Sequence, residues 1–235
     1  GCCSPETEKR ILEAVAETNF RPNPAARAMV TKKTNIIGVI LPDIYNYYFQ
    51  DLFKGAEDYL SKNGYRLILC NTDGDPQKER EFLLSLSQGM VDGIIVTPSN
   101  RAEDNAVILE LSAKGMPIVT VERYGKDLEN IPQVCFDNKN AMVKAVEALH
   151  SNGHTRIAFL RGPMEAYNAR LRYEGYQEGM RKAGLAIDDR LVLQGDYKMD
   201  SGERAAQMLL KGTEFTAIIA SNDLMALGAC KVIYK

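Results

Sequence analysis

Residues 36–41 read IIGVIL, an unbroken apolar run, and this stretch decides the fold. Such a run predicts a strand that is buried on both faces, as in a parallel sheet covered by helices on each side. The segment before it, residues 19–29, reads NFRPNPAARAM and predicts a short helix from Pro24 to about Val30. Residues 4–18 predict an amphipathic helix with Ser4 as its N-cap. A small helical module therefore precedes an α/β domain.

Apolar strands and helices alternate along the rest of the chain, which predicts an α/β fold with parallel sheets. Further strands are expected at residues 66–71, 91–97, 117–121, 133–136, 156–160, 191–194 and 217–220. Further helices are expected at residues 49–63, 77–88, 105–113, 138–151, 169–182, 201–211 and 224–232.

An internal repeat divides this α/β region into two similar lobes. A helix with Gly55 followed by Gly64 in the first half matches a helix with Gly175 followed by Gly184 in the second, at the same spacing. Two such lobes place a cleft between them, and in parallel sheets ligands bind beyond the carboxyl ends of the strands. We expect an N-terminal lobe at residues 35–135 and a C-terminal lobe at residues 136–235.

Composition indicates an ordinary globular chain, with 45% hydrophobic and 26% charged residues and a net charge of −2. Basic residues gather toward the end of the first 34 residues, where phosphate contacts are expected. No apolar run is long enough to cross a bilayer, and no signal-peptide pattern opens the chain, so a cytoplasmic location is expected. The five cysteines favour reduced, buried thiols over a disulfide framework.

Several motifs resemble those of the lactose/galactose repressor family of bacterial transcription regulators. They are SPET (4–7), FRPN (20–23), NIIGV (35–39), DGII (92–95), RLRYEGY (170–176) and NDLMALGA (222–229). Each motif alone is weak, but their shared order and spacing is specific and covers essentially the whole chain. The resemblance implies a type I periplasmic-binding-protein-like fold of two Rossmann-like lobes. It also implies that residues 1–34 are the end of a helix-turn-helix domain plus a hinge helix. Because the family has elements before and after this segment, the chain looks truncated at both ends.

The resemblance places a first group of ligand-binding residues in the N-terminal lobe. Asn46, Tyr48 and Phe49 follow the first strand and would face the cleft, although Phe49 could instead pack beneath its helix. Glu122 and Arg123 follow the fourth strand, where a carboxylate beside a guanidinium can grip hydroxyl groups from both sides. The alternative for this pair is a surface ion pair. The family usually has aspartate where Glu122 stands, which changes the depth of the pocket.

A second group comes from the C-terminal lobe and its junction. Asp137 is either a helix N-cap or a ligand contact. By resemblance, Arg172 points into the cleft and fixes an anionic or hydroxyl group, whereas Arg170 faces solvent.

Two further positions follow from the same resemblance. Tyr197 would form an aromatic wall of the cleft. Asn222 opens a helix whose N-terminal amides suit a hydroxyl-rich ligand, with Asp223 as the expected helix cap.

The hinge segment carries the expected DNA contacts. Arg27 and its neighbours would lie along the minor groove, and Met29 occupies the position where the family usually has a leucine that wedges a base step open. The alternative for Met29 is packing on the ligand domain in the absence of DNA. The full expected set is Ser4, Thr7, Asn23, Ala26, Arg27 and Met29.

These expectations describe a repressor-type regulator that binds a sugar or sugar-like effector and operator DNA, acts as a homodimer and needs no cofactor. Operator binding would need the helices that precede this segment. The alternative is a sugar-binding protein of similar fold that serves a transporter. An enzyme is disfavoured because the chain has no phosphate-binding glycine motif and no nucleophile with a plausible histidine partner. His150 and His154 are separated by Gly153, which argues against a shared metal.

Overall fold

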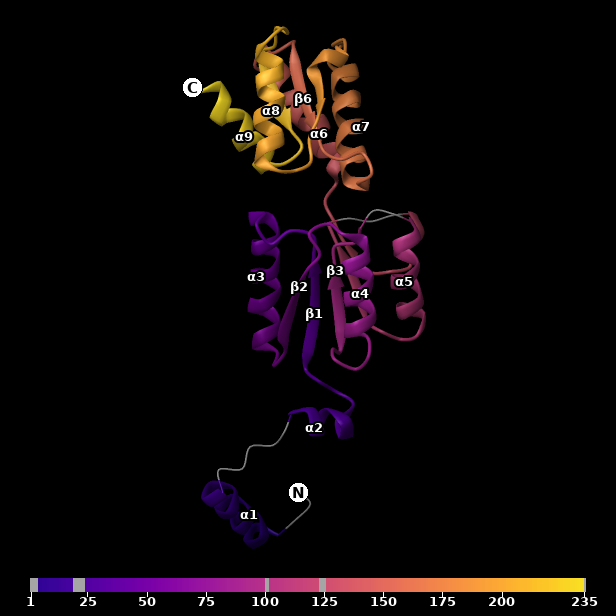
Figure 1. Cartoon of the computed structure of the whole chain (residues 1–235), viewed down its shortest axis with the longest axis vertical. Helices are drawn as coiled ribbons and strands as arrows, with labels where there is room; N and C mark the ends of the chain where they lie inside the picture. The colour runs from indigo at the N-terminus through magenta and orange to yellow at the C-terminus, as the bar shows by residue number, and fades with distance from the viewer. Residues whose placement is uncertain (1–3, 19–23, 100–101, 123–125, 235) are drawn as a thin grey trace.

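The computed structural model of the protein describes residues 4–18, 24–99, 102–122 and 126–234. Two α/β lobes lie end to end, each built on its own sheet (Figure 1). The N-lobe sheet contains β1 (Ile36–Leu41), β2 (Arg66–Asn71), β3 (Gly93–Val96), β4 (Ile118–Val121) and β5 (Gln133–Val134). The C-lobe sheet contains β6 (Ile157–Arg161), β7 (Val192–Gln194) and β8 (Ala217–Ala220).

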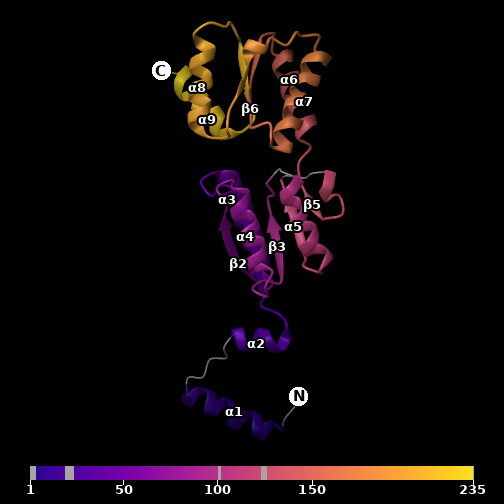
Figure 2. The same ribbon diagram turned by 45° about the vertical axis from the view of Figure 1, so that its right-hand side comes forward.

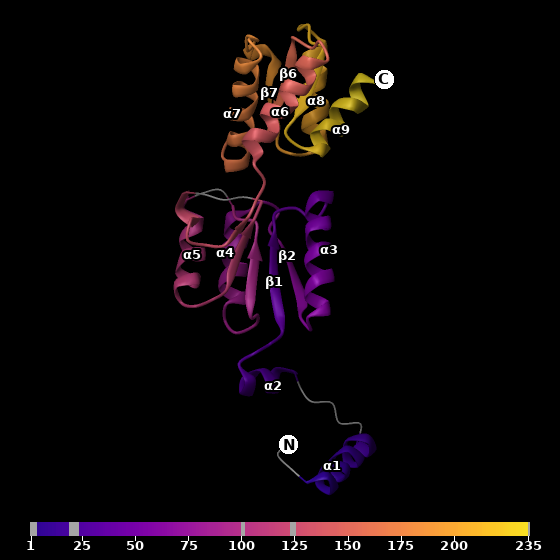
Figure 3. The same ribbon diagram turned by 180° about the vertical axis from the view of Figure 1, so that it is seen from behind.

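Both sheets are parallel, with strand orders β2-β1-β3-β4-β5 and β7-β6-β8. Helices cover each sheet on both sides, as Figures 2 and 3 show from two further directions. The N-lobe helices are α3 (Tyr47–Lys62), α4 (Pro76–Leu86) and α5 (Ala102–Ala113), with a 3-10 turn at Lys126–Leu128. The C-lobe helices are α6 (Asn138–Ser151), α7 (Tyr167–Lys182), α8 (Met199–Leu210) and α9 (Asp223–Ile233), with a 3-10 turn at Asp189–Leu191.

An interior strand of each sheet, β1 in the N-lobe and β6 in the C-lobe, is buried on both faces, and this explains its continuous apolar sequence. In β1, Ile40 packs into one core cluster, while Val39 and Leu41 pack into another with Phe49 of α3. In β6, Ala158 and Leu160 belong to one cluster, and Ile157 and Phe159 to the other. Alternate residues of a strand point to opposite faces, so each lobe has a core on either side of its sheet. The predicted fold class is confirmed.

The helices α1 (Pro5–Thr18) and α2 (Pro24–Thr31) lie beyond the N-lobe, on the side away from the C-lobe (Figure 1). Ser4 caps α1 as predicted, because its Oγ accepts from the Thr7 amide at 3.3 Å. No residue of α1 is buried. In α2, Met29 is 84% exposed, so it does not pack on the ligand domain.

The expected start of α3 and the expected burial of the cysteines both need correction; α5, α7 and α8 also begin two or three residues before their expected starts. Helix α3 begins at Tyr47 rather than Phe49, because the Asn46 side chain accepts from the Tyr48 amide and caps the helix two residues earlier. The cysteines are not uniformly buried: Cys70 is buried in β2, whereas Cys135 and Cys230 are exposed. Cys2 and Cys3 lie outside the described residues. Within those residues, no helix is both long and apolar enough to cross a membrane.

The repeated glycines have different surroundings in the two lobes. Gly64 and Gly184 both end helices at positive φ, 81° and 68°, a conformation that favours glycine. A Cβ atom at Gly175 would lie 2.2 Å from the carbonyl oxygen of Lys139 on α6, whereas a Cβ at Gly55 would meet nothing within 4 Å. Close contact between α6 and α7 therefore requires glycine at position 175.

We expect Gly175→Ala to lower the free energy of unfolding by about 2 kcal/mol, because α6 and α7 must move apart to admit the methyl group. The matched control Gly55→Ala should raise it by up to about 1 kcal/mol, because alanine favours a helix and nothing obstructs it there. Urea unfolding followed by circular dichroism measures both. Similar midpoints for the two variants would contradict the packing argument.

Candidate functional site

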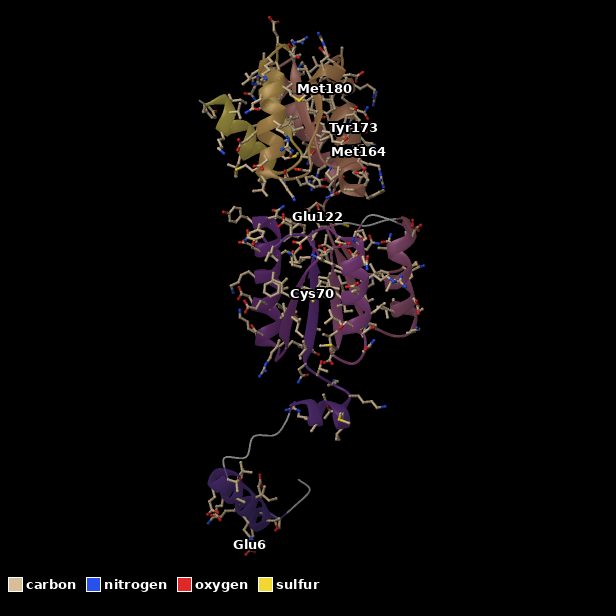
Figure 4. All side chains as sticks on the ribbon, in the orientation of Figure 1. Glu6, Cys70, Glu122, Met164, Tyr173 and Met180 are labelled. Atoms are coloured by element: carbon tan, nitrogen blue, oxygen red, sulfur yellow. The ribbon has the colours of Figure 1, made fainter. Side chains whose placement is uncertain are left out.

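The candidate site lies where the carboxyl ends of strands from both lobes meet. Glu122 follows β4 of the N-lobe, and Asn168 and Arg172 belong to the beginning of α7, after β6 of the C-lobe. Tyr197 and Ser221 follow β7 and β8. Figure 4 labels Glu122 at the level where the two lobes face each other. Parallel sheets usually bind ligands at this edge.

Arg172 is the centre of the cluster. Its Nε donates to Asn138 Oδ1 at 2.7 Å, one terminal nitrogen donates to the Ser221 carbonyl at 2.6 Å, and the other donates to Glu122 Oε1 at 3.1 Å. The side chains of Arg172 and Glu122 are only 17% and 6% exposed. The planar guanidinium thus joins α6 to the residues that directly follow β8 and β4 by hydrogen bonds in three directions, a geometry that lysine cannot reproduce.

Glu122 binds the C-lobe a second time. Its Oε1 also accepts from Asn168 Nδ2 at 2.6 Å. The Glu122 backbone has φ of 65°, in the left-handed region that disfavours non-glycine residues. This conformation turns the side chain at the end of β4, and charge-assisted hydrogen bonds to two C-lobe residues compensate for it.

Tyr197 forms one side of the cluster, also with a positive φ of 68°. Its hydroxyl donates to Asn168 Oδ1 at 3.3 Å, and its ring lies 5.9 Å from the Arg172 guanidinium carbon, within cation–π range. A Cβ atom at Gly162 would lie 2.3 Å from this ring, so the ring requires glycine at that position. The Tyr197 phenol therefore lies against the backbone of Gly162 and beside the Arg172 guanidinium.

The N-lobe supplies an aromatic group. The Tyr48 ring contacts Phe49 edge-on at 5.1 Å and Phe136 at 6.3 Å. Phe49 itself is 5% exposed and packs on Val39, beneath the surface of the site. Burial, and secondarily the Glu122 carboxylate, raises the pKa of Tyr48 to about 12. The Tyr48 phenol is therefore neutral at physiological pH and available as a hydrogen-bond donor.

Helix caps account for other expected residues. Asp137 caps α6 by accepting from the Asn140 amide at 3.0 Å. The cap of α9 is Asn222, not Asp223 as expected: its Oδ1 accepts from the Met225 amide at 3.1 Å, and its Nδ2 donates to the Tyr197 carbonyl at 2.8 Å. Asn222 acts as the cap because its backbone is extended and directs the side chain toward the helix amides.

One residue has other surroundings than expected, and two residues of the site were not expected. Arg170 does not simply face solvent, because it is half-buried and donates to the carbonyls of Met164 and Glu165. Sequence reasoning missed Asn138 and Asn168, which bind Arg172 and Glu122. Both are polar residues in the first turn of a helix that follows a strand, which was the available signal. Arg123 lies outside the described residues.

On the expected DNA side, Ala26 and Arg27 are exposed on α2. The Ser4 and Thr7 hydroxyls bond each other at 2.9 Å at the start of α1. Asn23 lies outside the described residues. Within the described ranges, no group of three His, Cys, Asp or Glu side chains could hold a metal ion.

Comparison with known proteins gives consistent matches. The family described as periplasmic binding proteins and sugar binding domain of LacI family matches residues 34–235. Catabolite control protein A of Priestia megaterium is 36% identical over 226 residues, which cover 95% of this chain and 67% of that protein. The ribose operon repressor of Halalkalibacterium halodurans is 35% identical over 235 residues, covering 100% and 68%. The crystal structure of transcription regulator CcpA of Lactococcus lactis superposes with a TM-score of 0.76 at 30% identity, covering 85% and 72%.

We expect Arg172→Met to lower the free energy of unfolding by about 3 kcal/mol, because it leaves the Glu122 carboxylate buried without its cation. The control Arg190→Met removes an exposed partner of Asp188 and should cost less than about 1 kcal/mol. Urea unfolding midpoints measure both.

Adding Glu122→Gln to Arg172→Met tests the cause. Removing the buried charge should recover most of the stability lost. A double variant as unstable as the sum of the two single variants would show that the ion pair is not the source of the loss.

Proposed function

The chain belongs to the LacI family of transcription regulators, the lactose/galactose repressor family, and from this we propose that its two lobes bind a neutral, sugar-like effector and thereby control DNA binding. The division is residues 1–34 for the DNA-binding and hinge segment, 35–135 for the N-lobe and 136–235 for the C-lobe. The named relatives are regulators of gene expression, which favours this function over transport of sugars.

We infer the chemical class of the effector from a pair of opposite charges that neutralise each other within the site. The guanidinium of Arg172 donates to the carboxylate of Glu122, so the two formal charges offset each other. Around them stand amide groups and the phenols of Tyr48 and Tyr197. Amides and phenols can donate to and accept from hydroxyl groups, and aromatic faces can stack on a sugar ring. A hydroxyl-rich neutral compound fits this chemistry better than a strongly charged one.

Control of DNA binding then follows from the contacts between lobes. Glu122 belongs to the N-lobe, and its partners Asn168 and Arg172 to the C-lobe. An effector that competes for these groups changes the contacts that hold the lobes in one arrangement. Such a ligand shifts the equilibrium only by its preference for one arrangement over the other. The ligand-contact set proposed is Asn46, Tyr48, Phe49, Glu122, Arg123, Asp137, Arg172, Tyr197 and Asn222.

The DNA-binding part of the proposal concerns α2. Arg27 and Met29 are exposed on this short helix, which is too short to be stable in water without a partner. Two copies of the helix, side by side in a homodimer, would gain a partner in each other and in the minor groove. Ser4, Thr7, Asn23 and Ala26 complete the proposed contact set.

A thermal-melt screen against neutral sugars, sugar phosphates and purines tests the effector class. A neutral sugar present at about 100 times its dissociation constant should stabilise the protein by about 2.7 kcal/mol. Arg172→Lys should weaken binding of that sugar at least about tenfold, because a single ammonium group cannot replace the planar guanidinium. The control Arg190→Lys should bind normally. Stabilisation by a sugar phosphate alone would overturn the neutral class.

Salt-dependent binding of the full-length protein to an operator selected from random DNA tests the hinge. Arg27→Ala should weaken binding and reduce the slope of log affinity against log salt by about 1. Met29→Ala should leave the slope unchanged and reduce the DNA bend. The control Arg181→Ala, on exposed α7 surface, should match the wild type. If the salt slope is unchanged in Arg27→Ala, Arg27 does not contact DNA phosphate.

A further inference from the structure

Asp92 holds the linker, residues 32–35, between the hinge helix α2 and the first strand, β1. Its Oδ1 accepts from the Thr34 amide at 2.7 Å and from the Thr34 hydroxyl at 2.8 Å. Its Oδ2 accepts from the Asn35 amide at 2.9 Å. The Asp92 amide in turn donates to the Ile36 carbonyl at 2.8 Å. We call this set of hydrogen bonds the linker clasp.

The linker clasp is the point where the chain leaves the lobe. Among the described residues, Thr34 is the first whose backbone amide bonds to a residue distant in the sequence. The hydroxyl of Thr31, three residues earlier, has local partners: it donates to the carbonyls of Arg27 and Lys33 and accepts from the Lys33 amide. Asn35 has a positive φ of 55°, and Lys32 of 53°. The linker therefore passes twice through the left-handed region close to the clasp, a conformation that asparagine tolerates and lysine disfavours, so its path needs a local constraint.

The surroundings do not provide that constraint by packing. A hollow of about 630 Å³ lies beside the linker, and residues of the linker and of the N-lobe, Asp92 included, line it. Lys32 and Lys33 line it on one side, and Glu110 and Lys114, which pair at 2.6 Å, on another. Burial raises the pKa of Asp92, but the hydrogen bonds from Thr34 and Asn35 outweigh it and leave that pKa lowered. The clasp is thus charged at physiological pH and depends on hydrogen bonds.

Asp92 is joined to the middle of the N-lobe sheet. It directly precedes β3, which pairs with β1 on one side and β4 on the other. The opposite end of β3 lies at the ligand-facing edge of the lobe. A strand paired on both sides moves with its sheet, so a rotation of the N-lobe carries Asp92 and the residues it binds.

We propose that Asp92 is a positioning residue that sets the orientation of α2 relative to the N-lobe, so that lobe rotation reaches the DNA-binding segment. Its effect on DNA rests on the function proposed above, whereas the clasp itself does not. Asparagine at this position keeps one acceptor oxygen but replaces the other with a donor, so Asp92→Asn releases the Asn35 amide. Thr34→Val removes the hydroxyl, and with it the bond to Asp92 and the bond that this hydroxyl accepts from the Ile36 amide at 3.2 Å, but it leaves both amide bonds to Asp92.

Hydrogen exchange and trypsin cleavage of the intact chain test the clasp without DNA. In Asp92→Asn, the Asn35 amide should exchange about tenfold faster and cleavage after Lys33 should accelerate, while the amides of β3 keep their protection. Thr34→Val should give a smaller change of the same kind, which keeps the test valid if Asp92→Asn disturbs folding. Glu110→Gln is the matched control, since it removes one negative charge from the same hollow.

The clasp would be contradicted if the Asn35 amide exchanged at the wild-type rate in Asp92→Asn. It would also be contradicted if Glu110→Gln accelerated that exchange equally. In the full-length protein, Asp92→Asn should weaken operator binding about tenfold and leave the effector affinity measured without DNA unchanged. A released linker with unchanged operator affinity would overturn the positioning role. If the wild-type protein binds no operator, the function proposed above fails, and the exchange and cleavage results alone decide the clasp.

Discussion

The ion pair of Glu122 and Arg172 is the interaction on which the relation between the two lobes depends. Both side chains are largely withdrawn from water, where a charge without its partner is costly. Each lobe has its own apolar cores, so neither needs the other to bury its sheet. The lobes are therefore joined by a polar contact rather than by a shared apolar core.

Strained backbone positions occur beside this contact. Glu122 and Tyr197 both have positive φ values at strand ends, one in each lobe. Such conformations persist only where surrounding contacts stabilise them, and they concentrate at functional sites. Here Asn168 binds both side chains, accepting from Tyr197 and donating to Glu122. One amide side chain therefore links the two strained positions, one in each lobe.

Much of the fold was predictable because burial on both faces produces continuous apolar strands. Helix α6 matches its predicted bounds, since Asp137 and Gly153 mark its ends in the sequence. The position of Arg172 was predicted from a motif, but its partner Asn138 depends on how α6 packs against α7. The choice between Asn222 and Asp223 as a cap depends on backbone angles that composition does not contain. Likewise, strand and helix patterns did not show that Cys135 and Cys230 are exposed.

Those two thiols give the molecule a built-in pair of labelling positions. Cys135 lies just after β5, and Cys230 lies on α9 of the C-lobe, so dyes attached to them would report the distance between the lobes. Cys70 is buried, and burial raises its thiol pKa, which slows its reaction with a dye. Burial and the Glu122 carboxylate also raise the pKa of Cys135, so Cys135 calls for a higher labelling pH. With serine at positions 2 and 3, lobe movement becomes visible by energy transfer without a substitution at any of the proposed ligand contacts.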